Sequence, residues 1–564
     1  MAVFIIIAIV VILLFLRGVS ENARNREKRK EALKKSFGAF SSRAYGYDEF
    51  ERIRSGLKYL RAKENEFEID DITANDINLD ELYKSINISC SQMGDEYLYR
   101  LLRRPVSSEE VLKERGRVAE LLDENEEFRL ELMERLKNMG RISGQGLWST
   151  LEKLDNVRCE SNALHYFCLA AALIAAVLIF VRPVIGFVAV LAVLFFNVFT
   201  YFKRKGEIDG ELVTFAYIFN CLYQAKYLIK IKAEKGLEKY FDTISAAVNS
   251  FKKVTSSSYI IFGGRSLTGS FLSLFVDYIR IVFHLDLIKF NSSLKFVLEN
   301  RTVLFELLET MGFLDAALSI ASFRRAVGIW CTPVFKDEDT LDIKGLHHPL
   351  IKDAVPYDIC TDRGVLVTGS NASGKSTFLR SVALGVLLGE TIYTVPAAEA
   401  GFAYSRIYSS MAASDSITGG DSLYMAEIKA VKRIVDALND SSYGNGNGRI
   451  ICFLDELLRG TNTIERIAAG SGILKELAGG GALCFAATHD IELTDILSER
   501  FDNYHFSESI ENDSIRFNYR LEKGAARTRN AIALLKLLGF DEKITAAAFE
   551  EAGKFENTRT WSRI

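Results

Sequence analysis

Long apolar stretches interrupt an otherwise amphipathic chain, and their length predicts membrane-spanning helices. Residues 2–16 are almost wholly apolar, and basic residues follow them over 17–35. That order is typical of an uncleaved anchor with its basic flank in the cytoplasm and its N-terminus outside. Residues 164–202 are apolar apart from Arg182-Pro183, and so form two stretches of about 18 residues, each about 27 Å long as a helix. We predict three spans, with Arg182 at the far surface. The alternatives are a cleaved signal or buried helix for the first stretch, and a buried helical hairpin for the second.

The rest of the chain divides into a helical part and a part with buried strands. Apolar residues recur at helical spacing before residue 336, and only 6 of the 564 residues are proline, which favours long helices. Continuous apolar runs at 365–368, 450–454 and 482–487 are typical of buried parallel strands. The predicted segments are an N-terminal transmembrane anchor (1–20), a basic linker and helical region (21–162), a transmembrane hairpin (163–202), a second helical region (203–335), and an α/β domain with C-terminal helices (336–564).

Composition narrows the function without deciding it. Apolar residues make up 49% and charged residues 25% of the chain, an ordinary balance that excludes a mainly disordered protein. The net charge of −3 excludes a uniformly basic nucleic-acid-binding surface, but not local basic patches. The eight cysteines form no C-x-x-C pair and no cluster with histidine. We therefore expect reduced cysteines in a cytoplasmic body and no metal cluster.

A phosphate-binding loop is the strongest chemical signal. Residues 369–376, GSNASGKS, fit G-x-x-x-x-G-K-[ST] between the apolar run at 365–368 and a helix starting near Thr377. Glycines let the backbone N–H groups surround phosphate oxygens, and the helix N-terminus favours an anion. Lys375 is expected to reach the β- and γ-phosphates of ATP, and Ser376 to ligate Mg²⁺. The predicted nucleotide-binding residues are Gly369, Ser370, Asn371, Ala372, Ser373, Gly374, Lys375, Ser376 and Thr377.

Polar residues at the ends of two later strands complete a hydrolytic site. Asp455 and Glu456 end the run at 450–454, where open α/β sheets bind ligands. Asp455 is predicted to hold Mg²⁺ and Glu456 to polarise the attacking water. His489, after the run at 482–487, is predicted to contact the γ-phosphate. Ser422 follows a glycine pair before a helix, so it either closes on the ATP of a second subunit or only begins an ordinary capped turn.

These motifs together resemble the MutS family of mismatch-repair ATPases over about residues 345–555. The resemblance is carried by His348-Pro349, TGSNASGKSTFLR (368–380), FLDELLRGTNT (453–463) and ATHDIELT (487–494). It implies an ABC-type ATPase fold, a homodimer with composite sites, ATP and Mg²⁺ as cofactors, Ser422 acting in trans, and duplex or mismatched DNA as a partner. Weaker similarity to the helical core and lever helices of the family covers 71–142 and 314–321.

The function predicted from the sequence is a membrane-anchored MutS-family ATPase, DNA-binding and related to mismatch repair. ATP binding and hydrolysis in a dimer would move the helical levers of a multi-pass cell-membrane protein with its bulk in the cytoplasm. No segment resembles the mismatch-reading and connector domains of the family, and the apolar hairpin stands near where the family inserts its DNA clamp. Two alternatives therefore stay open, a nucleotide-gated membrane scaffold that binds no DNA and a component of an ABC-type transporter.

Overall fold

The structure is a computed structural model that falls into two compact units. The first comprises the described residues within 1–61, 83–101 and 114–326, and the second those within 62–82, 102–113 and 327–564. The structure describes residues 24–59, 66–142, 146–153, 161–254, 278–370, 373–411, 423–439, 448–511, 514–526, 532, 535, 539–558 and 560–561. The first apolar stretch, predicted as the anchor at 1–20, lies outside the described residues.

The first unit is helical. Many of its core residues lie on α10 (Pro183–Leu228), α14 (Leu285–Glu299) and α15 (Arg301–Val327). Asp315 on α15 is fully buried and accepts hydrogen bonds of 2.8 Å from the backbone N–H groups of Cys90 and Ser91, so it fixes the start of α5. The helices lying wholly or mainly in this unit are α2 (Tyr47–Tyr59), α5 (Gln92–Arg103), α6 (Glu109–Glu124), α7 (Glu126–Met139), α8 (Leu147–Lys153), α9 (Ala163–Val181), α10 (Pro183–Leu228), α11 (Glu238–Ser250), α14 (Leu285–Glu299) and α15 (Arg301–Val327). Helix α4 (Leu79–Ile86) belongs to both units.

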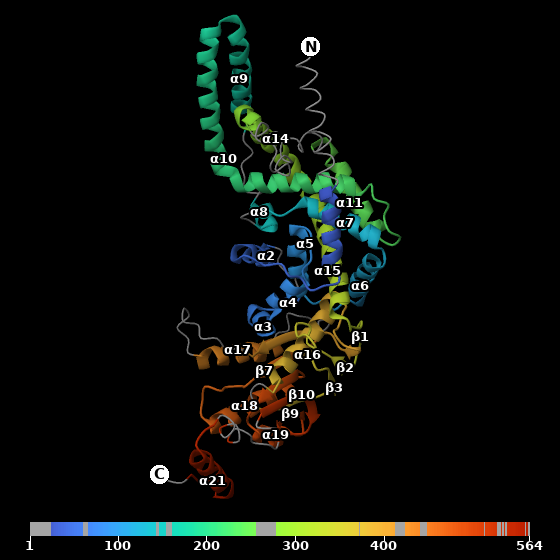
Figure 1. Cartoon of the computed structure of the whole chain (residues 1–564), viewed down its shortest axis with the longest axis vertical. Helices are drawn as coiled ribbons and strands as arrows, with labels where there is room; N and C mark the ends of the chain where they lie inside the picture. Colours follow the sequence, from blue (N-terminus) through green and yellow to red (C-terminus); the bar gives the residue numbers. More distant parts are fainter. Residues whose placement is uncertain are drawn as a thin grey trace. The chain divides into compact units, whose positions relative to one another are not determined.

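Helices α9 and α10 form an apolar hairpin, running side by side in Figure 1. They turn at Arg182-Pro183, and Gly186 allows the close approach, because a Cβ there would lie 2.4 Å from the backbone N of Ile179. Both helices are long and apolar enough to cross a membrane, with mean hydropathies of 2.5 and 2.3, and only 17% of each apolar window is buried. Most residues of the two apolar windows are therefore not buried by the described part of the chain.

The second helix of the hairpin is longer than the sequence predicted. It continues past residue 202 to Leu228, with non-helical backbone only at Ile208 (φ −130°, ψ 23°). The charged residues from Lys203 onward change the surface of the helix without ending it. The apolar turns and the charged turns thus lie in consecutive helical segments, with a kink at Ile208.

The second unit is built on two sheets. The six-stranded sheet has the order β10-β9-β4-β8-β7-β6, parallel except for the β9–β10 pair, and the four-stranded sheet has the order β1-β5-β2-β3. The predicted apolar runs become β4, β8 and β7, and every residue of β4 and β8 is buried. A helical region followed by an α/β domain confirms the predicted fold class at this level. The strands are β1 (Val334–Phe335), β2 (Leu341–Leu346), β3 (Tyr357–Thr361), β4 (Gly364–Thr368), β5 (Glu399–Phe402), β6 (Ser405–Ser410), β7 (Arg449–Asp455), β8 (Leu483–Thr488), β9 (Phe501–Glu511) and β10 (Ser514–Lys523), and the helices are α3 (Asp71–Asp76), α16 (Lys375–Ile392), α17 (Leu423–Leu438), α18 (Thr463–Gly479), α19 (Glu492–Ile496) and α21 (Glu542–Thr558).

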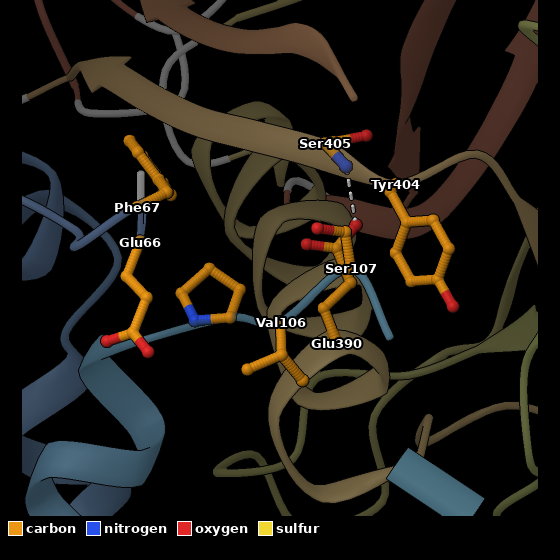
Figure 2. Close-up of a pocket in the computed structure, with 8 residues that line it drawn as sticks. Glu66, Phe67, Val106, Ser107, Glu390, Tyr404 and Ser405 are labelled. Carbon is orange, nitrogen blue, oxygen red and sulfur yellow. Dashed lines mark hydrogen bonds between the residues drawn. The ribbon is translucent and has the colours of Figure 1, made fainter. Parts of the chain in front are cut away.

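A cavity of about 140 Å³ lies near the C-terminal end of α16 (Figure 2). Glu390 in its wall is 1% exposed, and its carboxylate accepts a 2.8 Å hydrogen bond from the backbone N–H of Ser405. Burial raises the pKa of Glu390 well above its ordinary value, which favours the protonated carboxyl. The residues lining the cavity are Glu66, Phe67, Pro105, Val106, Ser107, Glu390, Tyr404 and Ser405.

The buried carboxyl predicts a pH-dependent stability that glutamine removes. The folded chain keeps the Glu390 proton above pH 4.3, where the unfolded chain loses it, so the free energy of unfolding falls as the pH rises through that interval, by about 1.4 kcal/mol per pH unit. Glu390→Gln keeps an acceptor for Ser405 and has no proton to lose. We expect its unfolding temperature, relative to wild type, to rise from pH 5 to pH 7.

Thermal unfolding followed by intrinsic fluorescence measures this difference. Glu338→Gln, at an exposed position of the same unit, is the matched control and should show no such rise. An equal pH dependence in wild type and Glu390→Gln would mean that the Glu390 carboxyl is ionised in the folded chain.

Candidate active site

The phosphate-binding loop lies between β4 and α16, as its sequence predicts. Gly369 and Gly374 have φ values of 145° and 114°, in the region that disfavours every residue with a Cβ. A Cβ on Gly369 would also lie 2.9 Å from the Ser373 hydroxyl oxygen. Helix α16 begins at Lys375, two residues earlier than expected, so Lys375 and Ser376 stand in its first turn. The predicted Asn371 and Ala372 lie outside the described residues.

Lys375 is directed into the loop. The side chain is buried, and its ammonium donates hydrogen bonds of 2.7 and 2.9 Å to the carbonyl oxygens of Gly369 and Ser370. Burial lowers the pKa of Lys375, and the negative charges of Asp455 and Glu456 oppose that change. The Lys375 ammonium therefore lies inside the loop, where a bound phosphate group would contact it.

Ser376 and Asp455 meet although 79 residues separate them in the sequence. The Ser376 hydroxyl donates to Oδ2 of Asp455, while Oδ1 of Asp455 is buried without a hydrogen-bond partner among the described residues. Burial raises the pKa of Asp455, and the Ser376 hydrogen bond opposes the rise. A hydroxyl and a carboxylate with a spare oxygen are the ligands that Mg²⁺ prefers, so this pair fits the predicted cation.

Glu456 and His489 are also brought together. They follow the neighbouring parallel strands β7 and β8, and Nε2 of His489 lies 2.9 Å from Oε1 of Glu456. Glu456 has a left-handed backbone (φ 53°), and its N–H donates to the carbonyl of Ala487 at 2.9 Å. Arg459 lies 3.6 Å from the other carboxylate oxygen of Glu456. The strained backbone turns the Glu456 side chain toward the end of β8 instead of along its own strand.

Three further residues were predicted for the site: Ser373, Thr377 and Ser422. Ser373 is buried, and its hydroxyl has no hydrogen-bond partner among the described residues. Thr377 lies in the first turn of α16, where its carbonyl accepts from the Ser381 hydroxyl at 2.8 Å. Ser422, predicted to act in trans, lies outside the described residues, so its placement stays a prediction.

Two carboxylates that the sequence analysis did not predict as site residues contact the site. Glu427 on α17 accepts a hydrogen bond from the backbone N–H of Leu458 and so holds the turn after Glu456. Glu508 on β9 accepts one from the hydroxyl of Ser370 in the phosphate-binding loop. No local pattern marks Glu508, because only the pairing of β9 with β4 brings it to the loop.

Comparison with known proteins supports this reading of the C-terminal part of the chain. Residues 365–556 match MutS domain V, an ABC-type ATPase domain. The chain is similar to the DNA mismatch repair protein MutS of Natronomonas pharaonis, 32% identical over 242 residues, which are 41% of this chain and 27% of that protein. It is 31% identical over 271 residues to the MutS protein of Thermotoga maritima (46% of this chain, 33% of that protein) and 31% identical over 215 residues to that of Thermus aquaticus (37% and 26%). The chain thus matches a third or less of the length of these relatives.

Proposed function

We propose that this chain, whose C-terminal part is a MutS-type ATPase domain, uses ATP hydrolysis in a homodimer to move its helical region at a membrane. The observation that carries the proposal is the convergence of Lys375, the Ser376–Asp455 pair and the Glu456–His489 pair at the C-terminal edge of one parallel sheet. A phosphate cradle, a cation site and a base with its partner are the parts that phosphoryl transfer to water requires.

Each side chain has a distinct proposed role. Lys375 leaves the loop carbonyls and binds the β- and γ-phosphates, and Ser376 and Asp455 would hold Mg²⁺. The cation, when bound, neutralises charge that develops on the phosphates. Glu456 exchanges its contact with His489 for the attacking water, which it orients and deprotonates. His489 then donates to the γ-phosphate, and Ser422 of the partner subunit closes the site.

Glu456→Gln should separate ATP binding from hydrolysis. The amide keeps the size of the side chain but accepts no proton, so we expect turnover to fall about 10²- to 10⁴-fold while ATP still binds. Steady-state ATPase assays and nucleotide titrations of the purified chain measure the two effects. Glu499→Gln, at an exposed position of the same unit, is the control and should keep full turnover. Full turnover in Glu456→Gln would show that another group is the base.

We propose that the hairpin of α9 and α10 spans the lipid bilayer. Its outward side chains are apolar and exposed, for example Phe180 at 88% and Phe195 at 78%. Its polar side chains turn inward instead: Asn197 is fully buried and donates to the carbonyls of Cys168 and Val282 at 3.0 and 2.9 Å. Apolar side chains outside, and a polar NH₂ group hydrogen-bonded to backbone inside, fit a lipid environment. With the predicted anchor at 1–20, this would give a multi-pass protein of the cell membrane with its bulk in the cytoplasm.

Cysteine labelling from outside the cell tests this topology. If the hairpin spans the bilayer, Arg182→Cys at its tip should react with a membrane-impermeant maleimide in intact cells that express the chain. Glu207→Cys, on the cytoplasmic part of α10, should react only after permeabilisation, and wild type gives the background from the native cysteines. Labelling of Arg182→Cys only after permeabilisation would mean that the tip stays on the cytoplasmic side and that protein covers the hairpin.

Duplex DNA is the partner that we propose for the helical region. Its support is the similarity to proteins named for DNA mismatch repair, which is confined to less than half of this chain. A scaffold gated by nucleotide and without DNA is the competing function, because the membrane hairpin has no role in reading a mismatch. A transporter component is a further alternative, and only substrate-stimulated turnover with transport in vesicles would support it.

ATPase rates with and without DNA distinguish these functions. If the helical region binds DNA, linear, branched or mismatched duplex should stimulate turnover of the detergent-purified chain, and the stimulation should weaken at higher salt as phosphate contacts are screened. Lys375→Ala, which removes the main phosphate-binding cation, is the control for contaminating ATPases. Turnover that no DNA changes at either salt concentration would favour the scaffold.

A further inference from the structure

An acidic side chain contacts the phosphate-binding loop. The Ser370 hydroxyl donates to Oε2 of Glu508, so a carboxylate is tied to the second residue of the loop. Its negative charge also acts on Lys375, where it favours the protonated ammonium. A carboxylate that acts on the phosphate-binding lysine also acts on the phosphates that this lysine would bind.

Backbone pairing fixes Glu508 in this place. Strand β9 runs parallel to β4, with His505 opposite Thr368, so the residues after His505 continue beside the loop that follows β4. The carbonyl of Phe506 lies 3.1 Å from where a Cβ on Gly369 would stand. On the other side, Glu508 pairs with Phe517 of β10. The backbone of β9 is thus paired with β4 as far as His505 and with β10 at Glu508, and these pairings place the Glu508 side chain beside the loop.

We propose that Glu508 sets the preference of the site between nucleoside triphosphate and diphosphate. In the structure its carboxylate accepts a hydrogen bond from Ser370 and attracts Lys375. Entering phosphates meet this negative charge, and a triphosphate, which carries one more charge near Lys375 than a diphosphate, meets more repulsion. The carboxylate must release Ser370 when ATP binds, and it returns after the γ-phosphate leaves. The inference rests on the proposed ATPase function and adds a specificity residue to the same site.

Nucleotide affinities of Glu508→Gln test the proposal. Glutamine keeps the length of the side chain and an oxygen that accepts from Ser370, so the variant should fold, but it lacks the charge. We expect a slowly hydrolysed triphosphate, ATPγS, to bind about ten-fold more tightly than to wild type, and ADP to gain only about two- to three-fold. Equilibrium titrations of the full-length, detergent-purified chain with Mg²⁺ give both dissociation constants.

A matched control lies on the neighbouring strand. Glu522 on β10 accepts a 2.8 Å hydrogen bond from Ser507, and Glu522→Gln makes the same change of charge away from the contact with Ser370. We expect it to leave the ratio of the two affinities unchanged.

The possible outcomes separate this inference from the function on which it rests. Wild type that binds both nucleotides, with an unchanged affinity ratio in Glu508→Gln, would overturn the role of Glu508 alone. Weaker ATPγS binding by Glu508→Gln would also overturn it, because the carboxylate would then support the loop. Wild-type chain that binds neither nucleotide would overturn the proposed ATPase function together with the inference.

Discussion

The parallel register of β4, β8 and β7 is the constraint on which the candidate site depends. Thr368 pairs with Thr488, and Asp455 with Ala487, so the three strands end at one edge of the sheet. The residues of the candidate site follow these strands directly: the phosphate-binding loop follows β4, Glu456 follows β7, and His489 follows β8. Because the strands are buried, a shift in register would expose apolar side chains, and the packing of the sheet thereby keeps the site in alignment.

The site has an excess of acidic groups around one buried cation. Asp455, Glu456 and Glu508 all act on Lys375, and burial works against the charge on both the lysine and Asp455. Such an arrangement is costly without ligands, because buried charges lose their hydration. A magnesium nucleotide would supply a cation for Asp455 and phosphates for Lys375. The electrostatics therefore favour binding of the two together over binding of either alone.

The first unit combines a buried helical core with an apolar hairpin that is largely exposed. Helix α10 connects them: its first turns expose apolar side chains, its later turns are largely buried, and it packs against α7, α11, α8 and α14. A kink at Ile208 divides α10, so the apolar hairpin and the helical core are joined through two helical segments that meet at one non-helical residue.

The sequence by itself determined the local chemistry of this protein. Three features depend only on residues that are neighbours in the chain, and so the sequence could predict them. They are the glycine spacing of the loop, the apolar runs of β4, β7 and β8, and the apolar length of α9. The sequence also implied that Asp455 and Ser376 serve one cation, because the ends of parallel strands meet at one edge. What it left open was every contact made by pairing across the sheet. Glu508 approaches Ser370 only because β9 lies beside β4, and Glu427 supports the turn after Glu456 only because α17 packs there. The length of α10 beyond residue 202 was hidden as well, since charged residues begin there while the helix continues. Hydrogen bonds between distant segments leave no periodic trace in a sequence, and so the tertiary structure alone decided which carboxylates surround the phosphate-binding loop.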